Sequence, residues 1–231
     1  MLVAIGIYAV INSNSQSKKQ LEENSTNIEG TTNTENSTKE NNTENKDEYI
    51  QNNQISNESE ENNMYSTGKH HAEIVVKNYG TIVLELDADV APITVENFAN
   101  LVNEGFYNGL TFHRIISGFM IQGGDPLGNG TGGSSKTIKG EFASNGVKNS
   151  ISHVRGTISM ARSSMPNSAS SQFFIVHQDS TFLDGKYAAF GTVTSGMEVV
   201  DKICADTAVE DDNGTVAKNN QPVIEKITII D

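Results

Sequence analysis

Several kinds of residue are scarce in this 231-residue chain, and these scarcities exclude some classes of structure and function. The chain has one cysteine, four prolines and no tryptophan. With Cys204 alone, an intramolecular disulfide and a multi-cysteine metal site are excluded, and its apolar neighbours predict a buried small side chain. The net charge is −13, and no basic cluster is present. Because phosphate binding depends on clustered Lys and Arg, we expect no nucleic-acid partner.

Composition divides the chain into three parts. Residues 1–11 form an apolar run, which is shorter than the about 20 residues of a membrane-spanning helix and typical of the hydrophobic region of an export signal. No basic residue precedes the run, so a truncated signal, a short anchor and a plain apolar N-terminus all remain open. Residues 12–67 are rich in Asn, Ser, Thr and Glu and carry a net charge of −7, which predicts a disordered tether. Residues 68–231 are the predicted folded domain.

The apolar run also bears on location. If it directs export, the protein is extracytoplasmic or membrane-associated through residues 2–11, and the tether lets the domain reach newly translocated chains. A cytoplasmic protein is the alternative.

Hydrophobic periodicity predicts many short strands and two helices in the domain. Residues 72–87 contain two β-branched runs joined at Gly80, which indicates a hairpin. After Pro92, apolar residues recur every three or four positions until Gly105, which predicts an amphipathic helix. A second helix is predicted over residues 197–204. Further strands are expected at residues 111–115, 119–122, 156–160, 173–177, 187–194 and 223–230.

Residues 112–133, with the sequence FHRIISGFMIQGGDPLGNGTGG, hold the most unusual grouping in the chain. Arg114 lies a few positions from apolar Phe119 and Met120 and from the neutral amide of Gln122, and a run of glycines follows. Arginine keeps its charge and offers a rigid fork of donors, so an arginine among aromatic residues indicates recognition of a planar, electron-rich group such as a carbonyl.

This stretch resembles the cyclophilin family of peptidyl-prolyl cis/trans isomerases. Four more segments agree with the family in order, namely GTISMA from Gly156, SSQFFIVH from Ser170, FLDGKYAAFG from Phe182 and GMEVVDKI from Gly196. The resemblance extends from residue 72 to the C-terminus. It implies an all-β fold, a closed eight-stranded antiparallel barrel capped by a helix at each end. It also implies a monomeric isomerase of X-Pro bonds in folding polypeptides, without cofactor or metal.

The chemistry of the X-Pro bond gives Arg114 a role. Rotation is slow because amide resonance resists it, with a barrier near ~20 kcal/mol, yet no covalent bond breaks. An arginine aimed at the amide nitrogen or the proline carbonyl stabilises the twisted amide without proton transfer. By resemblance, Arg114, Gln122 and Phe119 are the catalytic residues. By the same resemblance, substrate binding falls to Met120, Gly130, Ala161, Arg162, Ser163, Gln172, Phe174, Phe182, Leu183 and Tyr187, with Gly132 beside them.

These residues also have alternative interpretations. A proline-binding chaperone or scaffold with little turnover is the alternative function, and it has little need for Arg114. A serine hydrolase is not expected, because no G-x-S-x-G motif is present and no histidine can be tied to an acidic partner. His113 is predicted to be structural, since neighbours in a strand point to opposite faces. We expect no metal at His70, His71 or His153.

The chain departs from the family pattern at three pocket positions. Phe182 stands where many cyclophilins have tryptophan, Tyr187 where many have histidine, and Arg162 where asparagine is common, and the loop after Arg162 is one residue longer. Losing the indole N–H removes a hydrogen-bond donor. We therefore expect weak binding of cyclosporin-type inhibitors, with turnover retained, and an altered preference for residues beside the proline.

Overall fold

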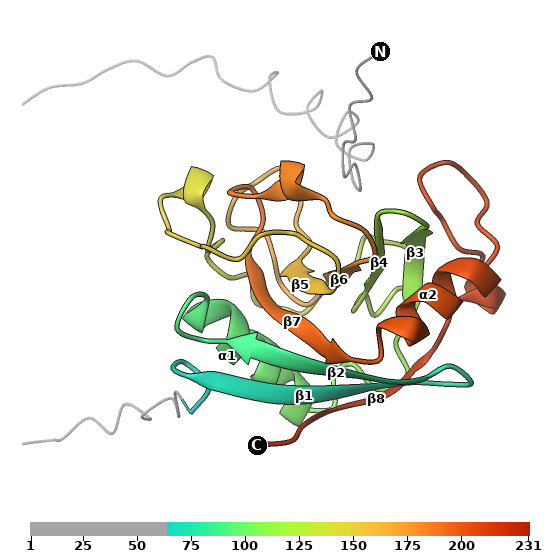
Figure 1. Cartoon of the computed structure of the whole chain (residues 1–231), viewed down its shortest axis with the longest axis horizontal. Helices are drawn as coiled ribbons and strands as arrows, with labels where there is room; N and C mark the ends of the chain where they lie inside the picture. Colours follow the sequence, from blue (N-terminus) through green and yellow to red (C-terminus); the bar gives the residue numbers. More distant parts are fainter. Residues whose placement is uncertain (1–63) are drawn as a thin grey trace, which may run out of the picture. The chain divides into compact units, whose positions relative to one another are not determined.

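The structure is a computed structural model that describes residues 64–231 (Figure 1). The predictions for the apolar segment and for nearly all of the tether lie outside these residues. Within the described part of the chain, no helix is both long enough and apolar enough to cross a membrane.

The predicted strands and helices are present, with boundaries that differ by a few residues. For example, the strand expected from Tyr187 begins at Ala189, because the preceding residues form the rim of the site described below. The helices are α1 (Pro92–Asn103) and α2 (Met197–Asp206). The strands are β1 (Lys69–Val76), β2 (Gly80–Asp87), β3 (Phe112–Ile116), β4 (Met120–Gly123), β5 (Thr157–Met160), β6 (Phe173–Val176), β7 (Ala189–Ser195) and β8 (Ile224–Ile229).

The strands form one antiparallel sheet in the order β3-β4-β6-β5-β7-β2-β1-β8. Its two edge strands approach each other at a single bridge between Thr111 and Val223, where the Phe112 N–H also donates to the Pro222 carbonyl. In Figure 1 the sheet runs from β1, β2 and β8 through β7 to β5, β6, β4 and β3. The eight antiparallel strands are confirmed, whereas full closure of the barrel is not.

A loop explains why β3 and β8 do not pair along their length. The outer edge of β3 instead forms hydrogen bonds with residues that precede β8. The Ile115 N–H donates to the Gly214 carbonyl at 2.8 Å, and the Val216 N–H donates to the His113 carbonyl at 3.0 Å. Gly214 has a φ of +81°, and a Cβ there would lie 2.3 Å from the Ile115 carbonyl oxygen. Only glycine fits such a close backbone approach.

Helix α1 is capped by a residue far away in sequence. It begins at Pro92, whose fixed φ suits the first helical position, and none of its own side chains caps it. The buried carboxylate of Glu141 instead accepts hydrogen bonds from the Ile93 N–H at 3.1 Å, the Thr94 N–H at 2.8 Å and the Thr94 hydroxyl at 2.7 Å. A carboxylate at a helix N-terminus satisfies free N–H groups and complements the helix dipole.

Strand alternation divides the apolar side chains between two faces of the sheet. On one face, Phe173 and Ile175 of β6 belong to the main hydrophobic core with Phe98 of α1, whose ring centroid lies 5.7 Å from that of Phe173. We call this the inner core. On the other face, Phe174 and Val176 belong to a separate group. We call this group the outer cluster, and its members are Phe119, Met120, Ala161, Phe174, Val176 and Leu183.

Candidate active site

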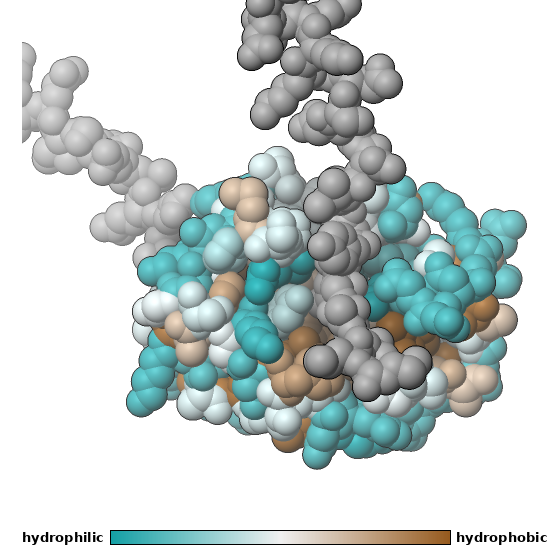
Figure 2. Space-filling model, turned by 90° about the horizontal axis from the view of Figure 1, so that it is seen from above, coloured by the Kyte–Doolittle hydropathy of each residue, from teal (hydrophilic) through white to brown (hydrophobic). Residues whose placement is uncertain are grey.

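The strands β3, β4 and β6 bring the predicted catalytic residues to the face that carries the outer cluster. Arg114 of β3 is in register with Gln122 of β4, and Gln122 is in register with Phe174 of β6. Register partners share a face. Figure 2 shows one face of the molecule, where hydrophobic residues gather in small areas among hydrophilic surface.

The residues predicted for a proline pocket lie together. Phe119, Met120, Phe174 and Leu183 are all buried members of the outer cluster, and Tyr187 packs against it. The structure therefore brings these five residues together in one apolar group.

The rim of the outer cluster is aromatic. Phe182 is 51% exposed, and its ring centroid lies 5.7 Å from that of Phe119. Tyr187 meets Phe174 edge-on at 6.0 Å, and burial raises the pKa of Tyr187 despite the opposing charges of two arginines. Arg162 stacks on Tyr187, 4.7 Å from the ring centroid, and donates from Nε and Nη2 to the Lys186 carbonyl. Arg162 therefore holds Tyr187 and the backbone of residue 186 in place at the rim.

The Arg114 side chain is held by hydrogen bonds to uncharged groups, which continue through the side chains of Gln122 and Gln172. Its Nε donates to the Asn213 carbonyl at 2.7 Å, its Nη2 to Asn213 Oδ1 at 3.1 Å and its Nη1 to Gln122 Oε1 at 3.3 Å. Gln122 Nε2 donates to Gln172 Oε1 at 2.9 Å, and Gln172 Nε2 donates to the Gly132 carbonyl at 2.7 Å. These bonds orient the guanidinium.

The guanidinium of Arg114 is buried without an ion-pair partner. The residue is 7% exposed, and it forms no salt bridge within residues 64–231. Burial lowers the pKa of Arg114, although Tyr187 and Asp211 act in the opposite direction. An arginine nonetheless stays protonated in proteins. The positive charge is therefore available to a polar group of a ligand in a partly desolvated place, where electrostatic interactions are strong.

Gln122 and Gln172 also line a cavity of about 140 Å³. Ala161 and Ser163 are among the residues predicted to bind substrate. The Ala161 N–H already donates to the Gln172 carbonyl and the Ser163 N–H to Ser168 Oγ, so these two donors are used within the protein. The predicted binding residues along the cavity wall are Gln122, Gly130, Gly132, Ala161, Arg162, Ser163 and Gln172.

A larger cavity of about 470 Å³ includes both His113 and Arg114 in its lining. Both ring nitrogens of His113 are buried, so its place among the lining residues does not contradict the prediction that it is structural. The register shifts between Phe112 and Arg114, which marks a β-bulge. A bulge interrupts strand alternation and commonly re-aims side chains beside functional sites.

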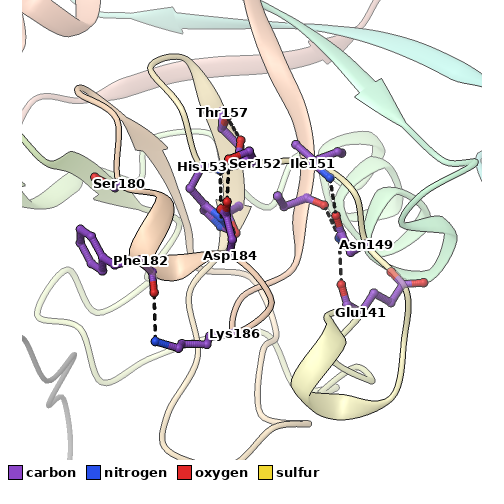
Figure 3. Close-up of polar contacts among 12 residues, drawn as sticks. Glu141, Asn149, Ile151, Ser152, His153, Thr157, Ser180, Phe182, Asp184 and Lys186 are labelled. Carbon is purple, nitrogen blue, oxygen red and sulfur yellow. Dashed lines mark hydrogen bonds and ion pairs between the residues drawn. The ribbon is translucent and has the colours of Figure 1, made fainter.

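A hydrogen-bonded network lies behind Phe174. His153 Nδ1 lies 2.9 Å from Asp184 Oδ1, and His153 Nε2 lies 3.0 Å from Ser159 Oγ. Figure 3 shows His153, Asp184 and Ser152 pointing toward one another. The His153 ring also stacks on Phe174, with centroids 6.0 Å apart. The network supports Phe174 from behind.

This network corrects one step of the sequence reasoning, because His153 does have an acidic partner. It remains unsuited to hydrolysis, since Ser159 is 0% exposed and no substrate reaches its hydroxyl. The sequence also gave no sign of Asn213 as the anchor of Arg114. Asn213 lies in an Asp-Asp-Asn-Gly turn, and nothing in that local sequence indicates a contact with Arg114.

Comparison with known proteins agrees with this arrangement. Residues 71–230 match the family described as cyclophilin type peptidyl-prolyl cis-trans isomerase/CLD. A peptidyl-prolyl cis-trans isomerase of Helicobacter pylori is 50% identical over 128 residues, covering 54% of this chain and 76% of that protein. Peptidyl-prolyl cis-trans isomerase B of Bacillus subtilis is 50% identical over 117 residues, covering 51% and 78%.

The fold of this chain also resembles that of solved cyclophilin-type structures. A Cryptosporidium parvum cyclophilin type peptidyl-prolyl cis-trans isomerase, crystallised in the presence of the dipeptide Ala-Pro, superposes with a TM-score of 0.62. It is 32% identical, and the match covers 70% of this chain and 99% of that one. The chain thus belongs to the cyclophilin-type peptidyl-prolyl cis-trans isomerase family, and the enzyme class predicted from its sequence is confirmed.

Proposed function

We propose that this isomerase accelerates X-Pro rotation by holding the proline ring on the outer cluster while Arg114 stabilises the twisted amide. The observation that carries the proposal is the single face shared by Arg114, Gln122 and Phe174. Because the guanidinium is buried and held by neutral acceptors, its charge is directed without being cancelled by a carboxylate. A preorganised charge of this kind favours the transition state over the ground state.

The outer cluster supplies the complementary grip. A proline ring is small and rigid, so little conformational entropy is lost when an apolar surface holds it. Phe119, Met120, Phe174 and Leu183 form that surface, and Phe182 and Tyr187 border it. Polypeptides containing X-Pro bonds are the proposed substrates, in keeping with the Ala-Pro dipeptide present with the Cryptosporidium relative.

The test is to separate turnover from binding. The full chain is added to a short Ala-Pro peptide, and the cis-to-trans exchange rate is measured by NMR without a coupled protease. We expect acceleration at enzyme concentrations far below that of the peptide. A peptide that binds at stoichiometric concentration with no faster exchange would identify a proline-binding module instead.

We also infer an extracytoplasmic or membrane-associated location, and a monomeric state, from the sequence alone. The first inference rests on the apolar run of residues 1–11. Cell fractionation tests it: intact chain found only in the cytosol contradicts it. Sedimentation tests the second.

A further inference from the structure

The short segment of residues 180–184 carries two side chains of the proposed proline-binding surface. Leu183 is a buried member of the outer cluster, and Phe182 borders the cluster beside Phe119. The segment contains a single 3₁₀ turn, Thr181–Leu183, and no side chain of the segment caps it. Such a short turn makes few hydrogen bonds of its own, so contacts from outside the segment determine where Phe182 and Leu183 lie.

The backbone of His153 holds both ends of this segment. Its carbonyl accepts a hydrogen bond from the Ser180 N–H at 2.7 Å, and its N–H donates to Asp184 Oδ1 at 2.7 Å. Asp184 Oδ2 also accepts from Ser152 Oγ at 2.6 Å. In Figure 3, Phe182 points away from this junction. The two ends of the turn are therefore fixed while its apolar side chains remain on the side of the outer cluster.

The imidazole of His153 connects the segment to Phe174. Its Nδ1 lies 2.9 Å from Asp184 Oδ1, and its ring stacks on the Phe174 ring with an interplanar angle of 18°. His153 is 1% exposed, so water does not compete for these contacts. One buried side chain thus contacts both Phe174 and the residue that follows Leu183.

The hydrogen bonds of the imidazole define its protonation state. Burial opposes the shift, but hydrogen bonds from Ser152 and His153 lower the pKa of Asp184, so its carboxylate only accepts and Nδ1 of His153 is the donor. Burial lowers the pKa of His153, although Asp184 acts in the opposite direction. Its Nε2 is therefore an acceptor near pH 7 and takes a hydrogen bond from Ser159 Oγ at 3.0 Å. Both ring nitrogens are paired, which fixes the orientation of the ring.

An apolar wall and a charged group contribute differently to this reaction. The proline ring keeps its shape while the X-Pro bond rotates, so a wall that touches only the ring binds the ground state and the transition state about equally. Losing such uniform binding raises KM and leaves kcat unchanged. Arg114 acts on the twisted amide, so its loss lowers kcat. KM and kcat therefore separate the two contributions.

We propose that His153 is a positioning residue of this isomerase. Through its hydrogen bond to Asp184 it holds Leu183 and Phe174 at the spacing that grips the proline ring, and so sets the affinity for substrate rather than the rate of rotation. The inference rests on the proposed function, because the outer cluster must be the surface that holds the proline.

The test uses the full chain and an Ala-Pro peptide, with exchange NMR over a range of peptide concentrations to separate KM from kcat. Asp184→Ala removes the acceptor of both His153 donors. It should raise KM about three- to tenfold, the range for one hydrogen bond, with kcat within about twofold of the wild type. Asp184→Asn keeps an acceptor oxygen and should restore KM.

The matched control is Asp231→Ala. Asp231 Oδ1 accepts from the N–H of His71 in β1 and lies 3.2 Å from its Nδ1, so the same kind of His–Asp pair is broken away from the outer cluster. This variant should leave KM and kcat unchanged. If Asp184→Asn failed to restore KM, the effect would belong to the charge of Asp184, and the proposal would be overturned.

A second variant protects the test against misfolding of Asp184→Ala. His153→Phe keeps a planar ring against Phe174 without the two nitrogens, and it should raise KM to a similar extent. Thermal unfolding checks that each variant is folded. A folded variant of either kind with the KM of the wild type would overturn the proposal. A fall in kcat at unchanged KM would also overturn it, since a merely structural role reduces the amount of active enzyme and not its affinity.

The ring resonances of Phe174 give a readout that does not depend on turnover. They should shift in Asp184→Ala, which is not a sequence neighbour of Phe174, and return in Asp184→Asn. Resonances that stay fixed in Asp184→Ala would show that the hydrogen bond does not hold the ring pair, which contradicts the proposal. Failure of the proposed function is distinguishable, because the wild type would then accelerate no Ala-Pro peptide.

Discussion

The two faces of β6 use similar side chains for different purposes. Phe173 and Ile175 face the inner core, where the chain itself covers them with Phe98 and other core residues. Phe174 and Val176 face the outer cluster, whose border residue Phe182 is half exposed. One strand thus supports the fold with alternate residues and the candidate site with the others. The comparison predicts that substitutions on the two faces separate stability from activity.

The largest expected effect comes from truncating the two neighbouring phenylalanines. Phe173→Ala should lower the free energy of unfolding by about 3–5 kcal/mol, because it leaves a cavity inside the core. Phe174→Ala should cost less stability, since the space that it leaves adjoins the proposed substrate surface, but should lower kcat/KM at least about tenfold. Denaturant titration and exchange NMR measure both quantities. Equal stability losses with equal activities would break the comparison.

The burial of His113 should also make stability depend on pH. The pKa of His113 is about 4 in the folded protein because of burial, below its ordinary 6.5. The unfolded chain therefore binds a proton first. The stabilisation is complete above pH 6.5 and is lost as pH falls toward 4, by about 3 kcal/mol in total.

Denaturant titrations at several pH values measure this dependence. Burial also lowers the pKa of His153, so part of the slope between pH 6.5 and 4 comes from that residue. The control is His113→Leu, which should flatten the remaining part. An unchanged slope in this variant would contradict the assignment to His113.

On the inner side, removing the distant cap of α1 should have a smaller effect. Glu141→Ala leaves the Ile93 and Thr94 N–H groups without their acceptor and should lower the free energy of unfolding by about 1–2 kcal/mol. Glu104→Ala, at the exposed C-terminal end of the same helix, is the matched control and should change stability little. Isomerase activity should be unaffected in both.

The smallest expected effect concerns the rim. Phe182 lacks the N–H of the tryptophan that many cyclophilins have, so Phe182→Trp should strengthen binding of a cyclosporin-type inhibitor by about two- to tenfold, the range for one hydrogen bond. Titration calorimetry of the wild type and the variant measures this difference. Nanomolar inhibition of the wild type would contradict the expectation.

The sequence predicted most of the architecture because local signals and tertiary structure agree. Period-two runs are strands, Pro92 begins α1, and the apolar residues predicted for a pocket lie together in the outer cluster. What could not be predicted depends on long-range contacts. The register shift before Arg114 interrupts the alternation of β3, and the cap from Glu141 crosses 47 sequence positions to Thr94. No sequence pattern near those residues predicts these long-range features.

The same limit applies to the supports of the candidate site. Asn213 anchors Arg114 from 99 positions away, because Gly214 lets its loop pair with β3. Asp184 reaches His153 across 31 positions. In the sequence, Asn213 and Asp184 look like ordinary turn or loop residues. Their contacts with Arg114 and His153 are visible only in the folded chain.

The central claim is that Arg114 stabilises the twisted amide, and one measurement tests it most directly. The cis-to-trans rate of an Ala-Pro peptide is compared for the full-length wild type and Arg114→Ala, with folding checked by thermal unfolding. We predict that the folded variant loses about two orders of magnitude in kcat/KM, which corresponds to about 3 kcal/mol of transition-state stabilisation. A folded Arg114→Ala variant that isomerises the peptide as fast as the wild type would contradict the account.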